Sequence, residues 1–188
     1  MDQTILDRIG KPMSNEDLEK YLAVRKHDIM KYSKLSDFKT IEELLPKDGD
    51  FQIILIEDKY NSGHWISIER KGKIINYFNS YGAKEDTDWR FIPRMIRIIL
   101  GQNTNDLTRL FKEAESRGYK IVRNKKRLQK LDDKIQTCGR WVVFWRHLSQ
   151  MGYSMKQFQD QIEKLRDNEE KQSGVRPTGD YIVSKYID

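Results

Sequence analysis

The sequence has 188 residues, of which 34% are charged and 37% are hydrophobic, and its formal net charge is +6. This length suffices to bury a real core, so we expect a single domain over residues 1–188. The chain has no apolar N-terminal stretch with a basic lead and no run near the roughly 18 apolar residues of a membrane span. Secretion and membrane insertion are therefore not expected, and the single cysteine, Cys138, excludes an internal disulfide.

The N-terminal part of the chain predicts one charged amphipathic helix. Ser14 can serve as its N-cap, and apolar residues fall near helical spacing, so the helix is expected over Asn15–Lys31. His27 lies in this stretch and is expected to be a partly exposed surface histidine. Residues 1–12 are expected to be flexible or loop.

Three apolar runs with a strand-like composition follow, over Phe51–Glu57, Trp65–Glu69 and Ile74–Phe78. The turn residues 71–73 lie between the second and third runs and predict a β-hairpin. His64 stands at the start of the second run, directly after a turn, where a side chain is well placed to face a cleft.

Asn79 follows the third run directly. If the two strands pair across the turn, Asn79 lies near His64, and its side-chain oxygen could accept a hydrogen bond from the imidazole and fix the tautomer. The sequence Asn79-Ser-Tyr-Gly also forms a turn readily without any catalytic duty, so both interpretations stay open at this point.

The second half of the chain predicts several helices and one short strand. Periodic apolar residues predict helices over Trp89–Leu100, Thr104–Arg117 and Ser154–Arg166. A short strand is expected over Tyr119–Val122, and a flexible or loop segment over residues 167–180 precedes an ordered segment at Tyr181–Ile187. The expected fold class is α+β, with a small mixed β-sheet packed against a central helix that carries Cys138 and with further helices around them.

Cys138 lies where polar residues give way to an apolar run without proline, which predicts a helix N-terminus. The unpaired N–H groups and the positive end of the helix dipole favour a thiolate there, which makes a cysteine nucleophilic. The alternative is that a lone cysteine is simply a small buried hydrophobic residue. The nucleophile interpretation predicts a cysteine hydrolase.

A catalytic thiolate needs an imidazole to take and return a proton, and the chain has three histidines. His147 follows Cys138 by nine positions on the same expected helix, so it would lie roughly 13 Å along the axis and out of reach. His27 is expected on a surface helix. His64 is therefore the expected partner.

These residues together resemble the ordered signature of the adenain-like cysteine proteases of clan CE. That group includes adenoviral capsid maturation proteases, related enzymes of virophages and Polinton-type viruses, and SUMO-deconjugating enzymes. The resemblance covers residues 51–150 and is carried by four motifs: Gly63-His64-Trp65, Tyr77-Phe-Asn79-Ser-Tyr-Gly82, Gln129 and Thr137-Cys138-Gly139. It implies an adenain/SUMO-protease-like fold.

The resemblance implies a role for each motif. Cys138 would be the nucleophile, His64 the general base and acid, and Asn79 the residue that orients the imidazole. Gln129 would donate to the oxyanion together with the backbone N–H of Cys138, whereas Gln136 belongs to the turn of the cysteine itself. The family most often has Asp or Glu at the third place, so Asn79 is a departure; an amide can hold the ring in a Cys-His-Asn arrangement. Asp86 and Asp88 are alternative third residues.

Trp65 is interpreted either as a core aromatic or as a wall of the substrate cleft beside the imidazole. Trp141 and Trp145 share a helix face with Cys138 and are expected in the core.

The segment between residues 117 and 130 contains basic residues and no acidic one. Such a run is usually a solvated loop, but its density also supports binding of a polyanion such as DNA. The candidate DNA-binding residues are Arg117, Lys120, Arg123, Lys125, Lys126, Arg127 and Lys130.

The resemblance implies a viral cysteine endopeptidase that cleaves capsid or other virion precursor proteins during particle maturation, in the virion and the host cell interior. The chemistry is expected to require no cofactor or metal. DNA or a noncovalently bound peptide could act as an activator. The expected oligomeric state is a monomer. Two alternatives remain. One is a ubiquitin-like-modifier deconjugating protease or acyltransferase of the same clan, and the other is a catalytically idle nucleic-acid-binding or scaffold protein.

Overall fold

The computed structural model describes residues 2–23, 28–87 and 92–188. The chain divides into two compact units. The first, here called the helical unit, comprises Met1–Val24, Ser80–Gly82 and Lys126–Asp188. The second, called the sheet unit, comprises Arg25–Asn79 and Ala83–Lys125.

The sheet unit is built on one five-stranded mixed sheet with the strand order β1-β2-β3-β4-β5. The two outer pairs, β1 with β2 and β4 with β5, are parallel, and the inner pairs are antiparallel. This arrangement confirms the predicted α+β class and the predicted hairpin. The strands are β1 (Ile29–Lys31), β2 (Phe51–Lys59), β3 (Ser62–Lys71), β4 (Ile74–Phe78) and β5 (Lys120–Arg123).

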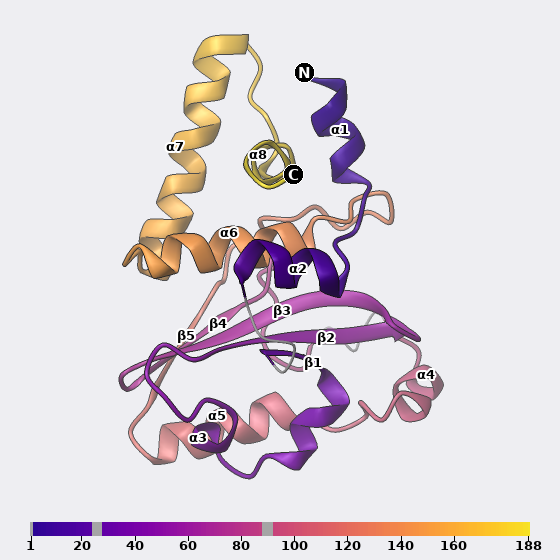
Figure 1. Ribbon diagram of the computed structural model, residues 1–188, viewed down its shortest axis with the longest axis vertical. Coiled ribbons are helices and arrows are strands. Elements are labelled where there is room, and N and C mark those ends of the chain that lie inside the picture. The colour runs from indigo at the N-terminus through magenta and orange to yellow at the C-terminus, as the bar shows by residue number, and fades with distance from the viewer. Residues whose placement is uncertain (1, 24–27, 88–91) are drawn as a thin grey trace. The chain divides into compact units, whose positions relative to one another are not determined.

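Short helices cover one face of this sheet, as Figure 1 shows for α3 and α5. Along β3 and β4 every second residue points to that face, so Ile66 and Ile68 meet Ile75 and Tyr77 there. The apolar side of α5 packs on these strand residues through Leu110 and Phe111 among others, and together they form one buried core. The helical segments of the unit are η2 (Tyr32–Asp37), α3 (Ile41–Leu44), α4 (Arg94–Ile99) and α5 (Asp106–Ser116).

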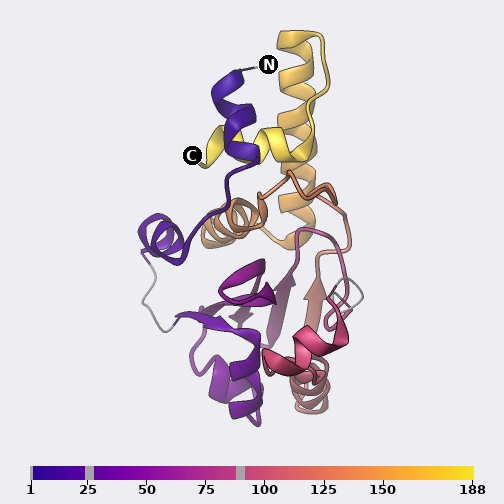
Figure 2. The ribbon, with the colours of Figure 1, turned by 90° about the vertical axis from the view of Figure 1, so that its right-hand side faces the viewer.

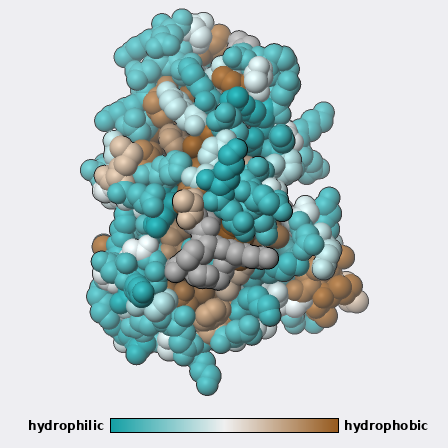
Figure 3. Space-filling view, viewed as in Figure 1, coloured by the Kyte–Doolittle hydropathy of each residue, from teal (hydrophilic) through white to brown (hydrophobic). Residues whose placement is uncertain are grey.

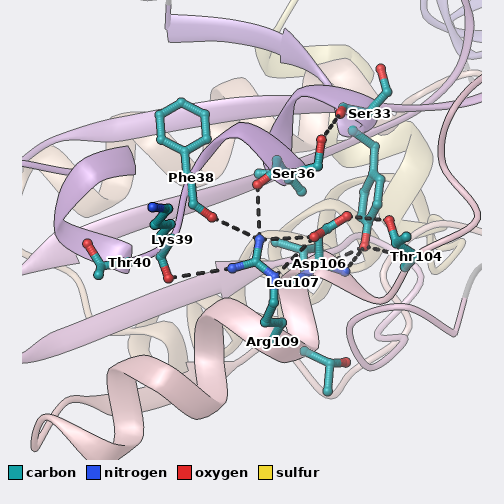
Figure 4. Close-up of polar contacts among 12 residues, drawn as sticks. Ser33, Ser36, Phe38, Lys39, Thr40, Thr104, Asp106, Leu107 and Arg109 are labelled. Carbon is teal, nitrogen blue, oxygen red and sulfur yellow. Dashed lines mark hydrogen bonds and ion pairs between the residues drawn. The ribbon is translucent and has the colours of Figure 1, made fainter.

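Arg109 ties α5 to η2 and to the residues that follow it (Figure 4). Its guanidinium donates to the carbonyl oxygens of Leu35, Phe38 and Lys39, at 3.2, 2.9 and 3.5 Å. It also pairs with the carboxylate of Asp106 at 2.9 Å. Five donors in one planar group can serve this many acceptors, which a lysine could not do.

Helix α4 presents exposed apolar side chains, which form a brown patch at the lower right of Figure 3. Met95, Ile98 and Ile99 are its exposed members. The helix is shorter than the predicted Trp89–Leu100, and residues 88–91 lie outside the described part of the chain.

The helical unit is organised around α6, whose side chains are buried over most of its length. Trp141 and Trp145 are fully buried and make edge-to-face contacts with Phe158 of α7, which confirms that they belong to the core. Figure 2 shows α1 beside α8, and the two helices are in contact. The helices are α1 (Gln3–Ile9), α2 (Asn15–Leu22), α6 (Cys138–Gln150), α7 (Met155–Ser173) and α8 (Gly179–Tyr186).

Two expectations about loops and one about a helix are wrong. Within residues 1–12, α1 forms because Asp2 caps it by accepting from the backbone N–H of Thr4. Within residues 167–180, α7 continues to Ser173, and Arg176 pairs with three acidic residues along its surface. The helix predicted over Asn15–Lys31 ends at Leu22, because Ala23 adopts a left-handed conformation and residues 29–31 join the sheet. His27 lies outside the described residues.

Candidate active site

His64 stands near the start of β3, after a turn with a tightly restricted backbone. A Cβ on Gly63 would lie 2.8 Å from the Cα of Glu57 and closer still to the carbonyl oxygen of Ile56, so only glycine fits there. The carboxylate of Glu57 accepts from the backbone N–H of Asn61 at 2.8 Å. The pairing between β2 and β3 is irregular at this end, between Glu57 and Lys59, and His64 lies opposite Ile56 just beyond the irregularity.

The imidazole of His64 is hydrogen-bonded to Asn79, with 2.9 Å between Nε2 and Oδ1. Asn79 is fully buried; its Nδ2 donates to the hydroxyl of Tyr77 at 3.2 Å, and its carbonyl oxygen accepts from Nδ2 of Asn124 at 2.8 Å. The amide oxygen of Asn79 faces the ring, and an amide oxygen can only accept a hydrogen bond. The ring nitrogen Nε2 therefore carries the proton of a neutral imidazole, and Nδ1 is the basic nitrogen. The proximity expected from the hairpin is confirmed.

Asp86, one of the two alternative third residues, has a different set of partners. Its carboxylate accepts from the hydroxyl of Tyr32 at 2.5 Å and from the backbone N–H of Thr108 at 2.7 Å. Burial raises the pKa of Asp86 above its ordinary value, although these hydrogen bonds oppose the shift. Asp86 therefore ties η2 to α5, and Asp88 lies outside the described residues.

Cys138 is the first residue of α6 and is buried, which confirms the expected helix N-terminus. The turn is closely packed, since a Cβ on Gly139 would lie 2.8 Å from Cβ of Met13. Arg140, two positions on, is buried and donates to the carbonyl oxygens of Ile187 and Lys11 at 3.1 and 2.6 Å. Burial lowers the pKa of Arg140, and Tyr21 is the main group that opposes this lowering. Cys138 therefore lies at the positive end of a helix dipole, which favours a thiolate.

Gln129 belongs to the same unit as Cys138 and is buried. Its Oε1 accepts from the hydroxyl of Ser80 at 2.7 Å, and its Nε2 donates to the carbonyl oxygen of Ile135 at 3.2 Å. The orientation of the amide is therefore determined. Gln136 instead donates to the carbonyl oxygen of Asp133, within its own loop. The choice of Gln129 over Gln136 as oxyanion donor stays a prediction.

Asp180 of α8 is a buried carboxylate that the sequence pattern does not single out. It accepts hydrogen bonds from the side chains of Thr137 and Trp141 and from the backbone N–H of Lys130. Burial raises the pKa of Asp180, and the hydrogen bonds oppose the shift. No local sequence signal identifies this residue, because it lies at the end of a polar stretch expected to be loop.

Trp65 is buried in β3, directly opposite Leu55 of β2. Its burial fits a core aromatic, and its predicted place in a cleft wall stays a prediction.

The basic run is divided between the two units and partly neutralised. In the sheet unit Arg123 makes a bidentate pair with the buried Glu85, at 2.7 and 2.8 Å, and Arg117 pairs with Glu42 and Glu113. In the helical unit Lys130 pairs with Asp132 at 3.3 Å. The other members of the run, Lys120, Lys125, Lys126 and Arg127, are exposed.

Within the described residues, no cluster of three or more His, Cys, Asp or Glu side chains could hold a metal ion. Among those same residues, none of the helices has the length and apolar character required to cross a bilayer.

Comparison with known proteins finds similarity both in sequence and in structure. No family model matches the chain. Protein V9 of the Sputnik virophage, which is uncharacterized, is 32% identical over 152 residues, or 80% of this chain and 84% of V9. The crystal structure of the ASFV pS273R protease has a TM-score of 0.51 and 13% identity, covering 96% of this chain and 68% of the protease. At that identity the likeness concerns the fold.

Proposed function

The chain belongs to the family of the Sputnik virophage protein V9, and we propose that it is a viral cysteine endopeptidase that cleaves virion precursor proteins during particle maturation. The observation that carries this proposal is the bond between His64 and the buried Asn79. An imidazole held in one tautomer by a buried amide is arranged for proton transfer rather than for packing alone. The shared fold with a protease and the resemblance to adenain-like enzymes support the same conclusion.

The proposed reaction is acyl transfer from a peptide to water. Nδ1 of His64 takes the proton of the Cys138 thiol, and the thiolate attacks the scissile carbonyl carbon. The tetrahedral oxyanion receives hydrogen bonds from Nε2 of Gln129 and the backbone N–H of Cys138. As the C–N bond breaks, His64 returns the proton to the leaving amine, and water then hydrolyses the thioester. This mechanism requires Cys138 and His64 to meet.

Asn79 serves this mechanism by holding the ring. The thiolate itself stabilises the imidazolium as an ion pair, so the third residue need only accept from Nε2–H. The Asn79 oxygen, 2.9 Å from Nε2, has the position for this role.

The proposed substrates are virion precursor proteins with small residues, often glycine, beside the scissile bond, met in the virion and the host cell interior. A monomer would suffice, and activation by a noncovalently bound peptide is compatible with a chain that has one cysteine. The alternative within the same chemistry is removal or transfer of a ubiquitin-like modifier.

The test incubates the purified chain with recombinant virion proteins of the same virus and, in parallel, with ubiquitin-like conjugates. New termini are identified by mass spectrometry. We expect the wild type to cut precursor proteins, and Cys138→Ala and His64→Ala to lose cleavage while remaining folded. His147→Gln serves as the matched control, because that imidazole contacts the carbonyl oxygen of Tyr21 and has no role in the reaction. Retained cleavage in either active-site variant would contradict the mechanism, and cleavage confined to conjugates would favour the alternative.

A second candidate activity is binding of DNA, favoured by the exposed Lys125, Lys126 and Arg127. Replacing all three by Gln should weaken DNA binding and reduce the slope of log K against log salt by about 0.9 for each phosphate that is no longer neutralised. The matched control replaces Lys156, Lys164 and Lys171, three exposed lysines of α7, by Gln. Equal DNA binding by the two triple variants would contradict a specific DNA-binding surface at residues 125–127. If the wild type also failed to cleave any protein in the test above, a scaffold role would be the remaining alternative.

A further inference from the structure

Asp180 joins three segments of the helical unit through one carboxylate. Oδ1 accepts from the hydroxyl of Thr137 at 2.5 Å and from the indole N–H of Trp141 at 3.2 Å. Oδ2 accepts from the backbone N–H of Lys130 at 2.9 Å. Thr137 precedes Cys138 and Lys130 follows Gln129, so the same side chain contacts the immediate neighbour of each of these two residues.

The backbone around Asp180 is fitted to this position. A Cβ on Gly179 would lie 2.7 Å from the carbonyl oxygen of Leu128 and 3.1 Å from the ring of Trp141. The start of α8 is therefore pressed against both the segment before Gln129 and the first turn of α6. Small movements of α8 would be passed to both segments, because close-packed interiors transmit displacement.

The carboxylate is retained here at an energetic cost, since its burial disfavours the charged form. The cost is explained by its partners, because three N–H or O–H donors converge on its two oxygens. An ionised carboxylate is acceptor-only and satisfies all of them. An asparagine of the same shape would turn its NH₂ group toward either Lys130 N–H or the indole of Trp141, and one donor would lose its acceptor.

We propose that Asp180 is a positioning residue that fixes the segment carrying Gln129 relative to the helix turn carrying Cys138. This inference rests on the proposed function, since it assigns Asp180 a part in placing the oxyanion donor against the nucleophile. Asp180 touches neither substrate nor sulfur in this role. Its effect is on the transition state, because the oxyanion forms only there.

The test compares Asp180→Asn with Asp160→Asn. Asp160 is a partly exposed aspartate of α7 that pairs with Lys156. We expect Asp180→Asn to lower kcat between about 10- and 100-fold, the cost of a small misplacement of a catalytic group, with little change in KM. Asp160→Asn should match the wild type. Alkylation of Cys138 by iodoacetamide should be no slower in Asp180→Asn, because the thiol remains in place and a nearby negative charge is removed.

The chemical-denaturation midpoint separates positioning from a purely structural role. Because the pKa of Asp180 is raised in the folded state, its ionisation destabilises the fold as the pH rises through that raised pKa. Asp180→Asn removes this destabilisation at neutral pH, which offsets the hydrogen bond that the variant loses. We therefore expect kcat to fall without a matching loss of stability. A kcat equal to that of Asp160→Asn, or a fall in kcat accompanied by slower alkylation and reduced stability, would overturn the inference.

Two further measurements keep the inference testable if Asp180→Asn fails to fold. Thr137→Ala removes one donor and should lower kcat, whereas Thr137→Ser keeps the hydroxyl and should restore it. In the wild type the amide hydrogen of Lys130 should exchange slowly, and fast exchange would contradict its bond to Asp180. A wild-type chain without Cys138-dependent hydrolysis would refute the proposed function and this inference with it. Hydrolysis in the wild type with no effect of Asp180 or Thr137 substitution would refute the inference alone.

Discussion

Replacing Asn79 by Ala removes the acceptor for the His64 ring and leaves the rest of the hairpin in place. The 2.9 Å bond from Nε2 is broken, and the Tyr77 hydroxyl loses its donor from the same amide. A hydrogen-bonding group left without its partner costs about 1–3 kcal/mol when buried. His64 is half-buried, so the lower part of that range applies.

We take about 1–2 kcal/mol, which corresponds to a loss of about 5- to 30-fold in kcat/KM. Most of the loss should fall on kcat, because the ring is free to adopt the other tautomer or rotate away from the thiol. Asn79→Asp keeps an acceptor at the same atom and should retain most of the activity.

The assay is steady-state hydrolysis of a peptide from the cleavage site, with stability measured in parallel. Asn76→Ala is the matched control. This buried amide lies on β4, the strand that directly precedes Asn79, but it contacts Glu69 and points to the other face of the sheet from Tyr77. The reasoning would be refuted if Asn79→Ala retained full kcat/KM, or if Asn76→Ala lost as much activity at equal stability.

Three other outcomes are expected. Gly63→Ala should abolish activity and lower stability, because its Cβ would lie inside contact distance of the Ile56 carbonyl; normal activity would contradict this. Arg109→Lys should reduce the free energy of unfolding by about 1–2 kcal/mol in urea titrations, with activity per folded molecule unchanged, since a lysine cannot serve the same acceptors. Burial raises the pKa of Glu85, but the Arg123 hydrogen bonds and charge outweigh it, so this pKa lies below 4.5. The Arg123–Glu85 pair should therefore add to the free energy of unfolding above the ordinary pKa of a glutamate, and this contribution should be lost as the pH falls through the lowered pKa of Glu85. In Arg123→Gln the free energy of unfolding should change less over the same acidic range.

The parts of the site that depend on local pattern could be predicted from the sequence. The start of α6 at Cys138 follows from a polar-to-apolar boundary, and the placement of Asn79 beside His64 follows from hairpin geometry. The sequence pattern that predicts the start of α6 lies within a few residues of Cys138, and the pattern that predicts the second contact spans a single hairpin. That is the range over which periodicity and turn chemistry act.

The parts that depend on contacts distant in sequence could not be predicted. Asp180 meets Thr137 and Lys130 across more than forty residues, and no pattern near position 180 reports those donors. The same limit explains the end of the helix expected over Asn15–Lys31, because residues 29–31 pair in parallel with β2. Tertiary pairing overrides local helical spacing there.

The ionisation of Cys138 tests the central claim most directly. Because the chain has one cysteine, its alkylation by iodoacetamide can be followed by intact mass in the wild type and in His64→Ala from pH 5 to 9. If the thiol and imidazole form an ion pair, the wild type should react rapidly well below about pH 8.5, where an ordinary thiol titrates, and His64→Ala should lose that reactivity. Identical pH profiles for the two proteins would contradict the pairing of Cys138 with His64.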